Sequence, residues 1–329
     1  MPLVLGIDTS CDDTGVGIAD GDKVLANVVR SQTALHAEFG GVVPERASRE
    51  HLDVIDAAVE DALATAGLEL SDLDAVAATR GPGLVGALLV GLSYGKALAW
   101  GLDVPFVPVH HLAGHLAAAT TPPPFLALIA SGGHTAMFTM TASGDFEELG
   151  RSRDDAAGEA FDKVARLLGL GYPGGAALSR LAEDGDDHGV SLPWPMQGAK
   201  GLEFSFSGLK TAVALLLRRR PDVSKADVAA TFERVAIGSL VEVTKRALTK
   251  TGLDKLVVAG GVAANRRLRS SFEDAGVEVV FPPSELATDN GAMIALAAGR
   301  ALGRAHDLGR TSALVSDAAP YLPLAGHVS

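Results

Sequence analysis

Three residues of the chain have the types and the spacing to bind one metal ion. His111 and His115 lie four residues apart, just after His110, at the start of a helical stretch. A four-residue spacing places both imidazoles on one face of a helix, within reach of a single ion. Asp289, before a long Ala-rich stretch, is a third candidate ligand. The alternative is that the histidines form a core or surface pair and that Asp289 is a helix N-cap.

The two histidines do not complete the metalloprotease motif H-E-x-x-H. No glutamate stands between His111 and His115. In that motif the glutamate activates the attacking water as a general base. The sequence therefore offers metal ligands without the base that a metallopeptidase of this class requires.

Two glycine-rich turns could bring backbone N–H groups close to a phosphate or a carboxylate. Ser131-Gly132-Gly133 follows an apolar run, and Ala259 to Asn265 ends a second run and begins a helical stretch. Glycine lets a ligand approach the backbone, and Asn265 could hydrogen-bond to a nucleotide there. Each turn alone is equally consistent with an ordinary tight connection. The sequence has no G-x-x-x-x-G-K-[ST] motif, which excludes the P-loop class.

A third glycine-rich segment, Gly81 to Gly86, matches the G-x-G-x-x-G pattern of dinucleotide-binding folds. In those folds the pattern lies in the first strand–helix turn, whereas three expected strands and a helix precede it here. The next acidic candidate, Asp103, stands before the following strand instead of at its end. We therefore interpret the segment as a strand-to-helix turn without a dinucleotide.

Acidic residues form two clusters next to these turns. Asp12 and Asp13 follow the first expected strand, and a second cluster in the middle of the chain consists of Asp154, Asp155, Glu159 and Asp162. Asp154 and Asp155 are also explained as residues that simply begin a helix. Cys11 has no histidine partner evident in the sequence. We interpret it as a small turn residue and not as a nucleophile.

The hydrophobic pattern predicts the elements that must position these residues. Alternating strands and helices are expected first, and a more helical second half follows. The expected strands are Leu3–Asp8, Thr14–Ala19, Lys23–Arg30, Ala75–Ala78, Val104–Val109, Leu256–Ala259 and Val277–Phe281, with a hairpin over Phe125–Met140. The expected helices are His51–Gly67, Gly86–Gly101, Asp155–Leu168, Leu209–Arg219 and Lys225–Lys250.

Two hairpins share a sequence pattern that suggests duplication. Both turns read S-x-x-x-T, from Ser10 to Thr14 and from Ser131 to Thr135. Two copies of a strand–turn–strand unit suggest a duplicated fold with one phosphate-facing hairpin in each lobe. We expect lobes at residues 1–121 and 122–289, and a C-terminal helix and tail at 290–329 that pack back on the lobes.

Charge and cysteine content limit the possible partners and compartments. The chain has 329 residues, a net charge of −12 and one cysteine. An acidic surplus opposes non-specific binding to nucleic acid, so any RNA contact is expected to be local or shared with another protein. One cysteine excludes an internal disulfide and a Cys-based zinc site. No signal peptide and no uninterrupted apolar run of about 18 residues is evident, so we expect a cytoplasmic protein without a membrane segment.

Taken together, these segments resemble the TsaD family, formerly described as glycoproteases, over nearly the whole chain. The resemblance rests on residues 6–12, 36–45, 47–51, 79–115, 131–135, 154–163, 204–210, 260–266 and 288–291. It implies a duplicated actin/Hsp70-like (ASKHA) nucleotide-binding fold, in the α/β class, with two lobes around a central cleft.

The resemblance implies an enzyme that transfers a threonylcarbamoyl group from L-threonylcarbamoyl-AMP to N6 of the adenosine just 3′ of the anticodon, releasing AMP. The substrates are tRNAs that read codons beginning with A. It also implies one divalent metal ion per chain, iron or else zinc, on His111, His115 and Asp289. The adenylate is then expected in the cleft, against Ile129, Ala130, Ser131, Gly132, Gly133, Asp162, Gly175 and Asn265.

Three further expectations concern the base, the metal and the partners. Asp12 is a candidate for the base that takes the N6 proton. Ile129 stands where archaeal and eukaryotic members carry a metal-contacting tyrosine, which indicates the bacterial branch and an open metal position. The bacterial partners implied are a TsaB-like paralogue and a TsaE-like P-loop ATPase, and tRNA is expected to bind their complex more tightly than the lone chain.

Three other functions compete with the transferase. A metallopeptidase lacks its base here, as described above. A sugar-kinase-like ATPase shares the fold but uses a catalytic aspartate and Mg²⁺, with no need of two histidines. A non-catalytic scaffold, like the shorter paralogue of the family, would be expected to lack the three ligands, and His111, His115 and Asp289 are all present.

Overall fold

A computed structural model of the chain describes residues 2–142, 145–304 and 313–324. It divides into two units, one of residues 1–120 with 282–329 and one of residues 121–281. The chain first passes from one unit to the other between residues 120 and 121, next to the Pro-rich segment at residues 122–124. Part of the tail expected to pack back on the lobes, residues 305–312 and 325–329, lies outside the described residues.

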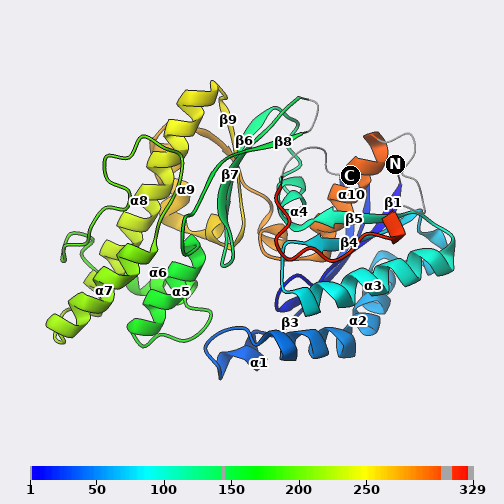
Figure 1. The fold of residues 1–329 in the computed structure, drawn as a ribbon, viewed down its shortest axis with the longest axis horizontal. Coiled ribbons are helices and arrows are strands. Elements are labelled where there is room, and N and C mark those ends of the chain that lie inside the picture. Colours follow the sequence, from blue (N-terminus) through cyan, green and yellow to red (C-terminus); the bar gives the residue numbers. More distant parts are fainter. Residues whose placement is uncertain (1, 143–144, 305–312, 325–329) are drawn as a thin grey trace. The chain divides into compact units, whose positions relative to one another are not determined.

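The first unit is built on a five-stranded sheet in the order β3-β2-β1-β4-β5 (Figure 1). Its strands are β1 (Leu3–Asp8), β2 (Asp13–Asp20), β3 (Lys23–Ser31), β4 (Ala75–Gly81) and β5 (Phe106–His110). The first three are antiparallel, whereas β1, β4 and β5 are parallel. The strands expected from the sequence are confirmed to within a few residues.

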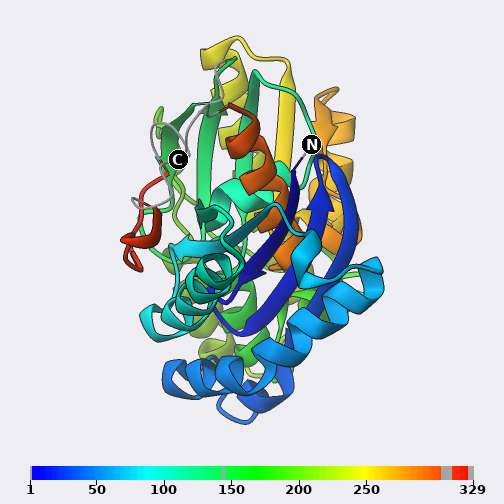
Figure 2. The same cartoon turned by 90° about the vertical axis from the view of Figure 1, so that its right-hand side faces the viewer.

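Helices cover both faces of this sheet, as Figure 2 shows. Helices α2 (Pro44–Ala66) and α3 (Val85–Leu102) lie on one face and α10 (Gly291–Arg304) on the other. The unit also contains α1 (Thr33–Ala37), α4 (His111–Ala117) and short 3-10 turns at Leu70–Asp72 and Ser284–Leu286. Alternate strand residues serve the two faces. Val4 and Ala77 pack in a cluster with α10, whereas Leu5 and Val76 pack with α2 and α3.

Helix α2 begins well before the start expected at His51. It begins at Pro44, where proline occupies the first turn. Proline lacks the N–H that this position leaves unpaired, and its φ is already helical. The start was predicted too late because the prediction relied on regularly spaced apolar residues. The first turn of the helix has only one buried residue, Ala47, and so gives no such pattern.

Helix α3 is long and apolar enough, by length and composition alone, to cross a membrane. In the structure it is a core helix of the first unit. Leu88, Leu92 and Ala99 are buried, and the helix packs against β4 and α2. The helix thus has one buried face, whereas Val85, Leu89 and Trp100 on its other side are 54%, 48% and 78% exposed.

The second unit repeats the architecture of the first. Its sheet has the order β10-β9-β6-β7-β8, with β6 (Phe125–Ala130), β7 (Thr135–Met140), β8 (Phe146–Arg151), β9 (Lys255–Ala259) and β10 (Glu278–Val280). The hairpin β6–β7 is antiparallel and β9 adds to β6 in parallel, as β1–β2 and β4 do in the first unit. The duplication expected from the two hairpins is confirmed.

Helices of the second unit enclose one large apolar core. They are α5 (Ala157–Leu167), α6 (Gly175–Ala182), α7 (Ser207–Arg219), α8 (Lys225–Thr251) and α9 (Arg266–Asp274), with a 3-10 turn at Gly261–Ala264. Phe161, Phe204, Phe206 and Phe232 are buried in this core. Strand β8 and helix α6 were not expected from the sequence, because β8 alternates poorly and α6 has only eight residues.

Candidate metal centre and glycine-rich turns

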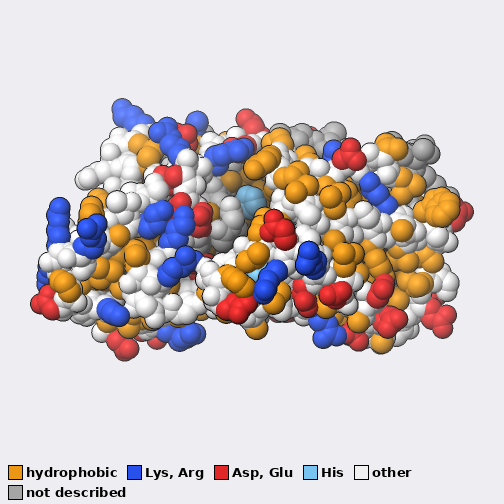
Figure 3. Space-filling model, turned by 60° about the horizontal axis from the view of Figure 1, so that its bottom comes forward, with side chains coloured by type: hydrophobic (Ala, Val, Ile, Leu, Met, Phe, Trp, Pro, Cys, Tyr) orange, Lys and Arg blue, Asp and Glu red, His pale blue; other side chains and the backbone are white. Residues whose placement is uncertain are grey.

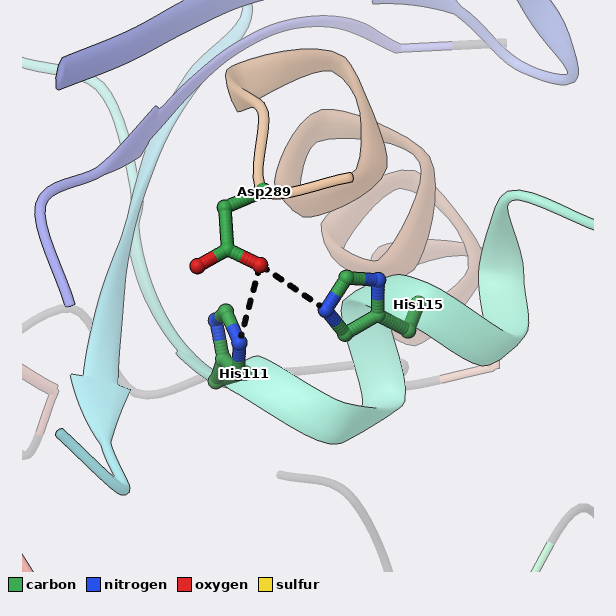
Figure 4. A group of neighbouring side chains, drawn as sticks. All are labelled: His111, His115 and Asp289. Carbon is green, nitrogen blue, oxygen red and sulfur yellow. Dashed lines mark hydrogen bonds and ion pairs between the residues drawn. The ribbon is translucent and has the colours of Figure 1, made fainter. Parts of the chain in front are cut away.

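The two histidines and Asp289 converge on one point of the first unit (Figure 4). Helix α4 begins at His111 directly after β5, so both histidines stand at the carboxyl end of a parallel strand, where ligands bind in α/β folds. Nε2 of His115 lies 3.2 Å from Oδ1 of Asp289, and Nε2 of His111 lies 3.6 Å from the same oxygen. Both histidines are buried.

Asp289 is placed by the close packing of α10 on the hairpin β1–β2. A Cβ on Gly6 would lie 2.3 Å from the backbone nitrogen of Ala295, so only glycine allows this approach. Asn290, not Asp289, caps the helix: its Oδ1 accepts a hydrogen bond from the N–H of Met293 at 2.9 Å. The N-cap alternative for Asp289 is therefore wrong, because its carboxylate faces the histidines and its neighbour does the capping.

The second ring nitrogen of His111 is also engaged. Nδ1 lies 3.1 Å from Oγ of Ser10 and 3.3 Å from Oδ2 of Asp8. Both oxygens therefore face Nδ1, and the charge of Asp8 acts on the ring. The other oxygen of Asp8 accepts hydrogen bonds from the Thr79 hydroxyl at 2.7 Å and from the Ser10 N–H at 3.2 Å.

These charges control the protonation of His111. Burial lowers the pKa of the imidazole, but the carboxylates of Asp8 and Asp289 outweigh burial and raise this pKa to about 9. Without a cation the ring therefore carries a proton at neutral pH. A bound cation would replace that proton and the charge it supplies.

The donor set fits a divalent transition metal. Two ligands held about 2.1 Å from one ion, at angles of 90–109°, lie about 3.0–3.4 Å apart. The distances from Asp289 to the two histidines are close to that range, whereas the 4.8 Å within which all three ligand atoms lie exceeds it, so the side chains would draw together around an ion. Two imidazoles with one carboxylate are typical of iron(II) and zinc sites that keep open positions.

The turn between β1 and β2 carries Cys11, Asp12 and Asp13. Burial, reinforced by the nearby Asp12, raises the pKa of the Cys11 thiol far above its usual range. A thiol is a poor nucleophile, which agrees with its interpretation as a small turn residue. Burial also raises the pKa of Asp13 to about 6, against a hydrogen bond to Ser31 and with help from the charges of Asp12 and Asp289. The sequence places Asp13 beside Asp12 in one acidic pair, and only the burial seen in the structure distinguishes the two.

The turn Ser131-Gly132-Gly133 in the second unit is ordered by its own backbone. The N–H of Ser131 donates to the carbonyl of His134 at 2.8 Å, and Oγ of Ser131 accepts from the N–H of His134 at 3.1 Å. The N–H groups of Gly132 and Gly133 have no partner among the described residues, and both glycines are exposed. Gly158 of α5 supports the turn by donating its N–H to the carbonyl of Ser131 at 3.1 Å.

Asp162 and Asn265 also hold backbone turns. Oδ1 of Asp162 accepts from the N–H groups of Gly174 and Gly175, at 2.7 and 3.0 Å. Oδ1 of Asn265 caps α9 by accepting from the N–H of Leu268 at 2.9 Å. Its amide nitrogen donates to Ser179 Oγ at 3.1 Å and to Glu233 Oε1 at 2.7 Å. Both N–H bonds of the Asn265 amide are thus used within the unit, which leaves its oxygen to accept a further bond.

Asp154 and Asp155 do not begin the helix that follows them. Asp154 accepts from Ser205 and Ser207 hydroxyls at 2.6 and 2.7 Å, and from the backbone N–H of Phe206 at 2.7 Å, so it caps α7 from outside that helix. Asp155 pairs with Lys163 and Lys210 at 2.9 and 2.7 Å. These bonds join two segments that the sequence showed only as separate motifs.

The repeated sheet and its paired hairpins define a duplicated α/β protein of the ASKHA class. Solved structures agree on the fold alone. Component A of (R)-2-hydroxyglutaryl-CoA dehydratase from Acidaminococcus fermentans matches with a TM-score of 0.56 and 18% identity, over 91% of this chain and 97% of that one. HypF of T. kodakarensis matches with a TM-score of 0.62 and 15% identity, over 92% of this chain and 48% of that one.

Sequence comparison identifies the family within this class. The family model for TsaD, tRNA N6-adenosine threonylcarbamoyltransferase, matches residues 23–296. An enzyme of that name from Thermus thermophilus is 58% identical over 90% of this chain and 92% of its own length. The one from Chromobacterium violaceum is 49% identical over 93% and 95%. The chain belongs to the TsaD family of tRNA N6-adenosine threonylcarbamoyltransferases, which form t6A.

Proposed function

We propose that the chain transfers the threonylcarbamoyl group of L-threonylcarbamoyl-AMP to N6 of the adenosine just 3′ of the anticodon, in the cytoplasm. In this step N6 forms a bond to the carbamoyl carbon, the bond from that carbon to the adenylate oxygen breaks, and AMP leaves. The observation that carries the proposal is membership of the TsaD family over most of the chain. The intact His–His–Asp group adds support.

His111, His115 and Asp289 would hold one divalent ion, iron or else zinc. When bound, such an ion supplies a Lewis acid that polarises a carbonyl or phosphoryl oxygen. The protein contributes two buried imidazoles, the partly exposed carboxylate of Asp289 and the charge of Asp8 at the far side of His111. A carboxylate at the second nitrogen fixes the orientation and the tautomer of a ligating imidazole.

The adenylate would bind the turns of the second unit, through residues 129–133, Asp162, Gly175 and Asn265. Support comes from the exposed N–H groups of Gly132 and Gly133, which have no partner within the described part of the chain. Adjacent N–H groups at a turn form a concave anion site suited to a phosphate. Asp162 supports the same surface indirectly, because it fixes the turn at Gly175.

Attack by N6 releases a proton that must be accepted. Asp12 is our candidate for that base, and it lies in the turn that also contains Ser10, a partner of His111. Asp13, the next residue, has its pKa raised to about 6 by burial and lies in the same turn. A carboxylate with a pKa near the working pH is suited to exchange a proton during a reaction.

The charge distribution favours a tRNA contact on the second unit, in a complex with other proteins. Residues 121–281 contain 19 of the 28 Lys and Arg residues and 20 acidic residues, so the net charge of −12 falls almost entirely on the first unit. Figure 3 shows Lys and Arg side chains gathered over the second unit. A TsaB-like paralogue and a TsaE-like P-loop ATPase would supply the remaining contacts.

Mass spectrometry of tRNA nucleosides tests the reaction directly. Unmodified tRNA is incubated with threonylcarbamoyl-AMP, the chain and its proposed partners, and is then digested to nucleosides. We expect t6A in the complete mixture and none without the chain. Consumption of threonylcarbamoyl-AMP with unmodified adenosine in the tRNA would contradict the proposed acceptor.

A further inference from the structure

Four polar side chains form a buried hydrogen-bonded network beside the turn between β1 and β2. Thr14, Gln32, His36 and His51 are each at most 3% exposed. Residues 36 and 51 belong to segments that carry the family resemblance, yet the site described above does not use them. Burying polar groups costs free energy unless they are hydrogen-bonded. A buried network of four polar side chains is therefore a candidate for a functional role.

The position of each proton in the network follows from its partners. The N–H of Val43 can only donate, so Nδ1 of His36 accepts it at 3.3 Å, and Nε2–H of His36 donates to Oε1 of Gln32 at 3.0 Å. The carbonyl of Cys11 can only accept, so Nε2–H of His51 donates to it at 3.1 Å. Burial lowers the pKa of His51, and the neutral ring accepts the Thr14 hydroxyl at Nδ1, at 2.7 Å.

This network holds the turn from which Ser10 contacts His111. Three successive carbonyls of the turn accept hydrogen bonds from three different segments. Ser10 accepts from the N–H of Leu84 at 2.8 Å, Cys11 from His51 at 3.1 Å, and Asp12 from the N–H of Gln32 at 3.0 Å. Two of these donors are backbone groups that almost any residue supplies. His51 is the one side-chain donor among the three, so it is the one that a substitution can remove.

We infer that His51 is a positioning residue for the transfer reaction, acting through the carbonyl of Cys11. Its hydrogen bond fixes the turn that carries Ser10, whose Oγ lies 3.1 Å from Nδ1 of His111, and Asp12. Release of that carbonyl would let the turn move, and with it both side chains. The inference rests on the proposed use of His111 as a ligand and of Asp12 near the reacting atoms. Small displacements of positioned groups cost large factors in rate.

Two substitutions at residue 51 separate the contacts of its two ring nitrogens. His51→Gln places an amide nitrogen near the position of Nε2, so it can still donate to the Cys11 carbonyl. His51→Asn places an amide oxygen near the position of Nδ1, so it can accept from Thr14 but does not reach Cys11. Ile55→Val, one turn along α2 and also buried, is the control for a loss of packing that leaves the turn untouched.

We measure kcat and KM for t6A formation, metal affinity by competition with a chelating dye, and the melting temperature. His51→Asn should lower kcat by about tenfold or more and weaken metal binding, with little change in KM for tRNA. His51→Gln should keep most of the parent's kcat at a similarly reduced melting temperature, and Ile55→Val should keep all of it. Parent-like kcat in His51→Asn, or equal losses in both variants, would overturn the inference.

A second pair of variants covers a failure of the residue 51 variants to fold. Thr14→Val removes the shorter of the two hydrogen bonds to Nδ1 of His51, the other coming from the Gln32 amide at 3.3 Å, and Thr14→Ser keeps it. We expect kcat to fall in the first and to be restored in the second, and parent-like kcat in folded Thr14→Val would overturn the inference. His111→Ala is measured in parallel to separate this result from the metal proposal. Parent-like kcat in His111→Ala would contradict the proposed role of His111 as a ligand. The ratio of kcat between His51→Gln and His51→Asn would still test His51.

Discussion

Oδ2 of Asp8 lies 3.3 Å from Nδ1 of His111, whose other nitrogen, Nε2, faces Asp289 at 3.6 Å. A carboxylate at Nδ1 stabilises the tautomer with hydrogen on that atom and leaves the Nε2 lone pair for a metal. Asp8 is itself held, because its other oxygen accepts from Thr79 and from the N–H of Ser10. The residue therefore controls which nitrogen of His111 can act as a ligand.

Asp8→Asn should weaken metal binding more than Asp8→Ala does. The amide oxygen would keep the two bonds from Thr79 and Ser10, so the amide N–H₂ would face Nδ1 of His111. An amide N–H₂ facing Nδ1 favours the tautomer with hydrogen on Nε2, where it blocks ligation, and the Ser10 hydroxyl can donate to Nδ1 in that tautomer. We expect affinity to fall by about tenfold to a hundredfold in Asp8→Asn. Dye-competition titrations measure it, and an Asp8→Ala variant that binds as weakly would argue against control by tautomer.

Loss of any one ligand should empty the centre while the fold survives. His111→Ala, His115→Ala and Asp289→Ala each leave two donors, and we expect metal content to drop below detection and t6A formation with it. Loss of a supporting contact alone typically costs about tenfold to a hundredfold in affinity, so loss of a ligand should cost at least as much. Metal analysis, product assays and circular dichroism are compared with the parent. A folded, metal-free triple variant with full activity would remove the Lewis-acid role.

The sequence located the ligands but not the residues that orient them. His111 and His115 could be found because a helix repeats its face every three to four residues, and that spacing is local. Asp289 was ambiguous, since an acidic residue before a helix also suits an N-cap, and only the packing of α10 shows that Asn290 takes that role. Asp8 and His51 were recognisable as members of motifs, but their contacts span 103 and 40 residues along the chain. No local pattern encodes such contacts.

Asp154 should stabilise the second unit in a pH-dependent way. Burial raises the pKa of its carboxyl, but the hydrogen bonds from Ser205, Phe206 and Ser207 outweigh burial and lower this pKa to about 2, below its ordinary value of 3.8. A pKa lower in the folded state means that the stabilisation is complete above the unfolded value and is lost as pH falls through the folded one. We expect Asp154→Ala to cost about 1 kcal/mol near neutral pH, as for the loss of a helix cap on an exposed residue.

Urea titrations of the parent and of Asp154→Ala at several pH values measure this effect. The difference in unfolding free energy should be constant from neutral pH down to about pH 4 and should shrink between about pH 4 and pH 2. Glu147→Ala is a suitable control, since Glu147 is an exposed carboxyl on β8 of the same unit and is not among the residues that cap α7. A difference that stays constant down to about pH 2 would show that the carboxylate charge is not what stabilises the α7 terminus.

Glu233 and Asn265 form a hydrogen-bonded pair. We expect that stability lost by adding a charge at residue 265 is partly regained by removing the charge at residue 233. Glu233 is 7% exposed, and its Oε1 accepts from the Asn265 amide at 2.7 Å. Asn265→Asp replaces that donor with a second carboxylate and should destabilise the unit by about 2–3 kcal/mol, because two carboxylates then face each other and Oε1 of Glu233 loses its donor, while Arg267 still pairs with Oε2 at 3.6 Å. Adding Glu233→Gln supplies an amide that can donate to the new carboxylate, so the double variant should recover much of the loss.

A double-mutant cycle on unfolding free energy isolates the coupling between the two positions. Glu233→Gln alone is the matched control, and it should cost less than Asn265→Asp, since a neutral amide needs no partner charge. The same four proteins can be titrated with AMP, because Asn265 belongs to the proposed adenylate site. If the orientation of the Asn265 amide matters there, AMP affinity should fall in Asn265→Asp and recover in the double variant together with stability. Additive costs would mean that the bond between Glu233 and Asn265 does not fix that orientation.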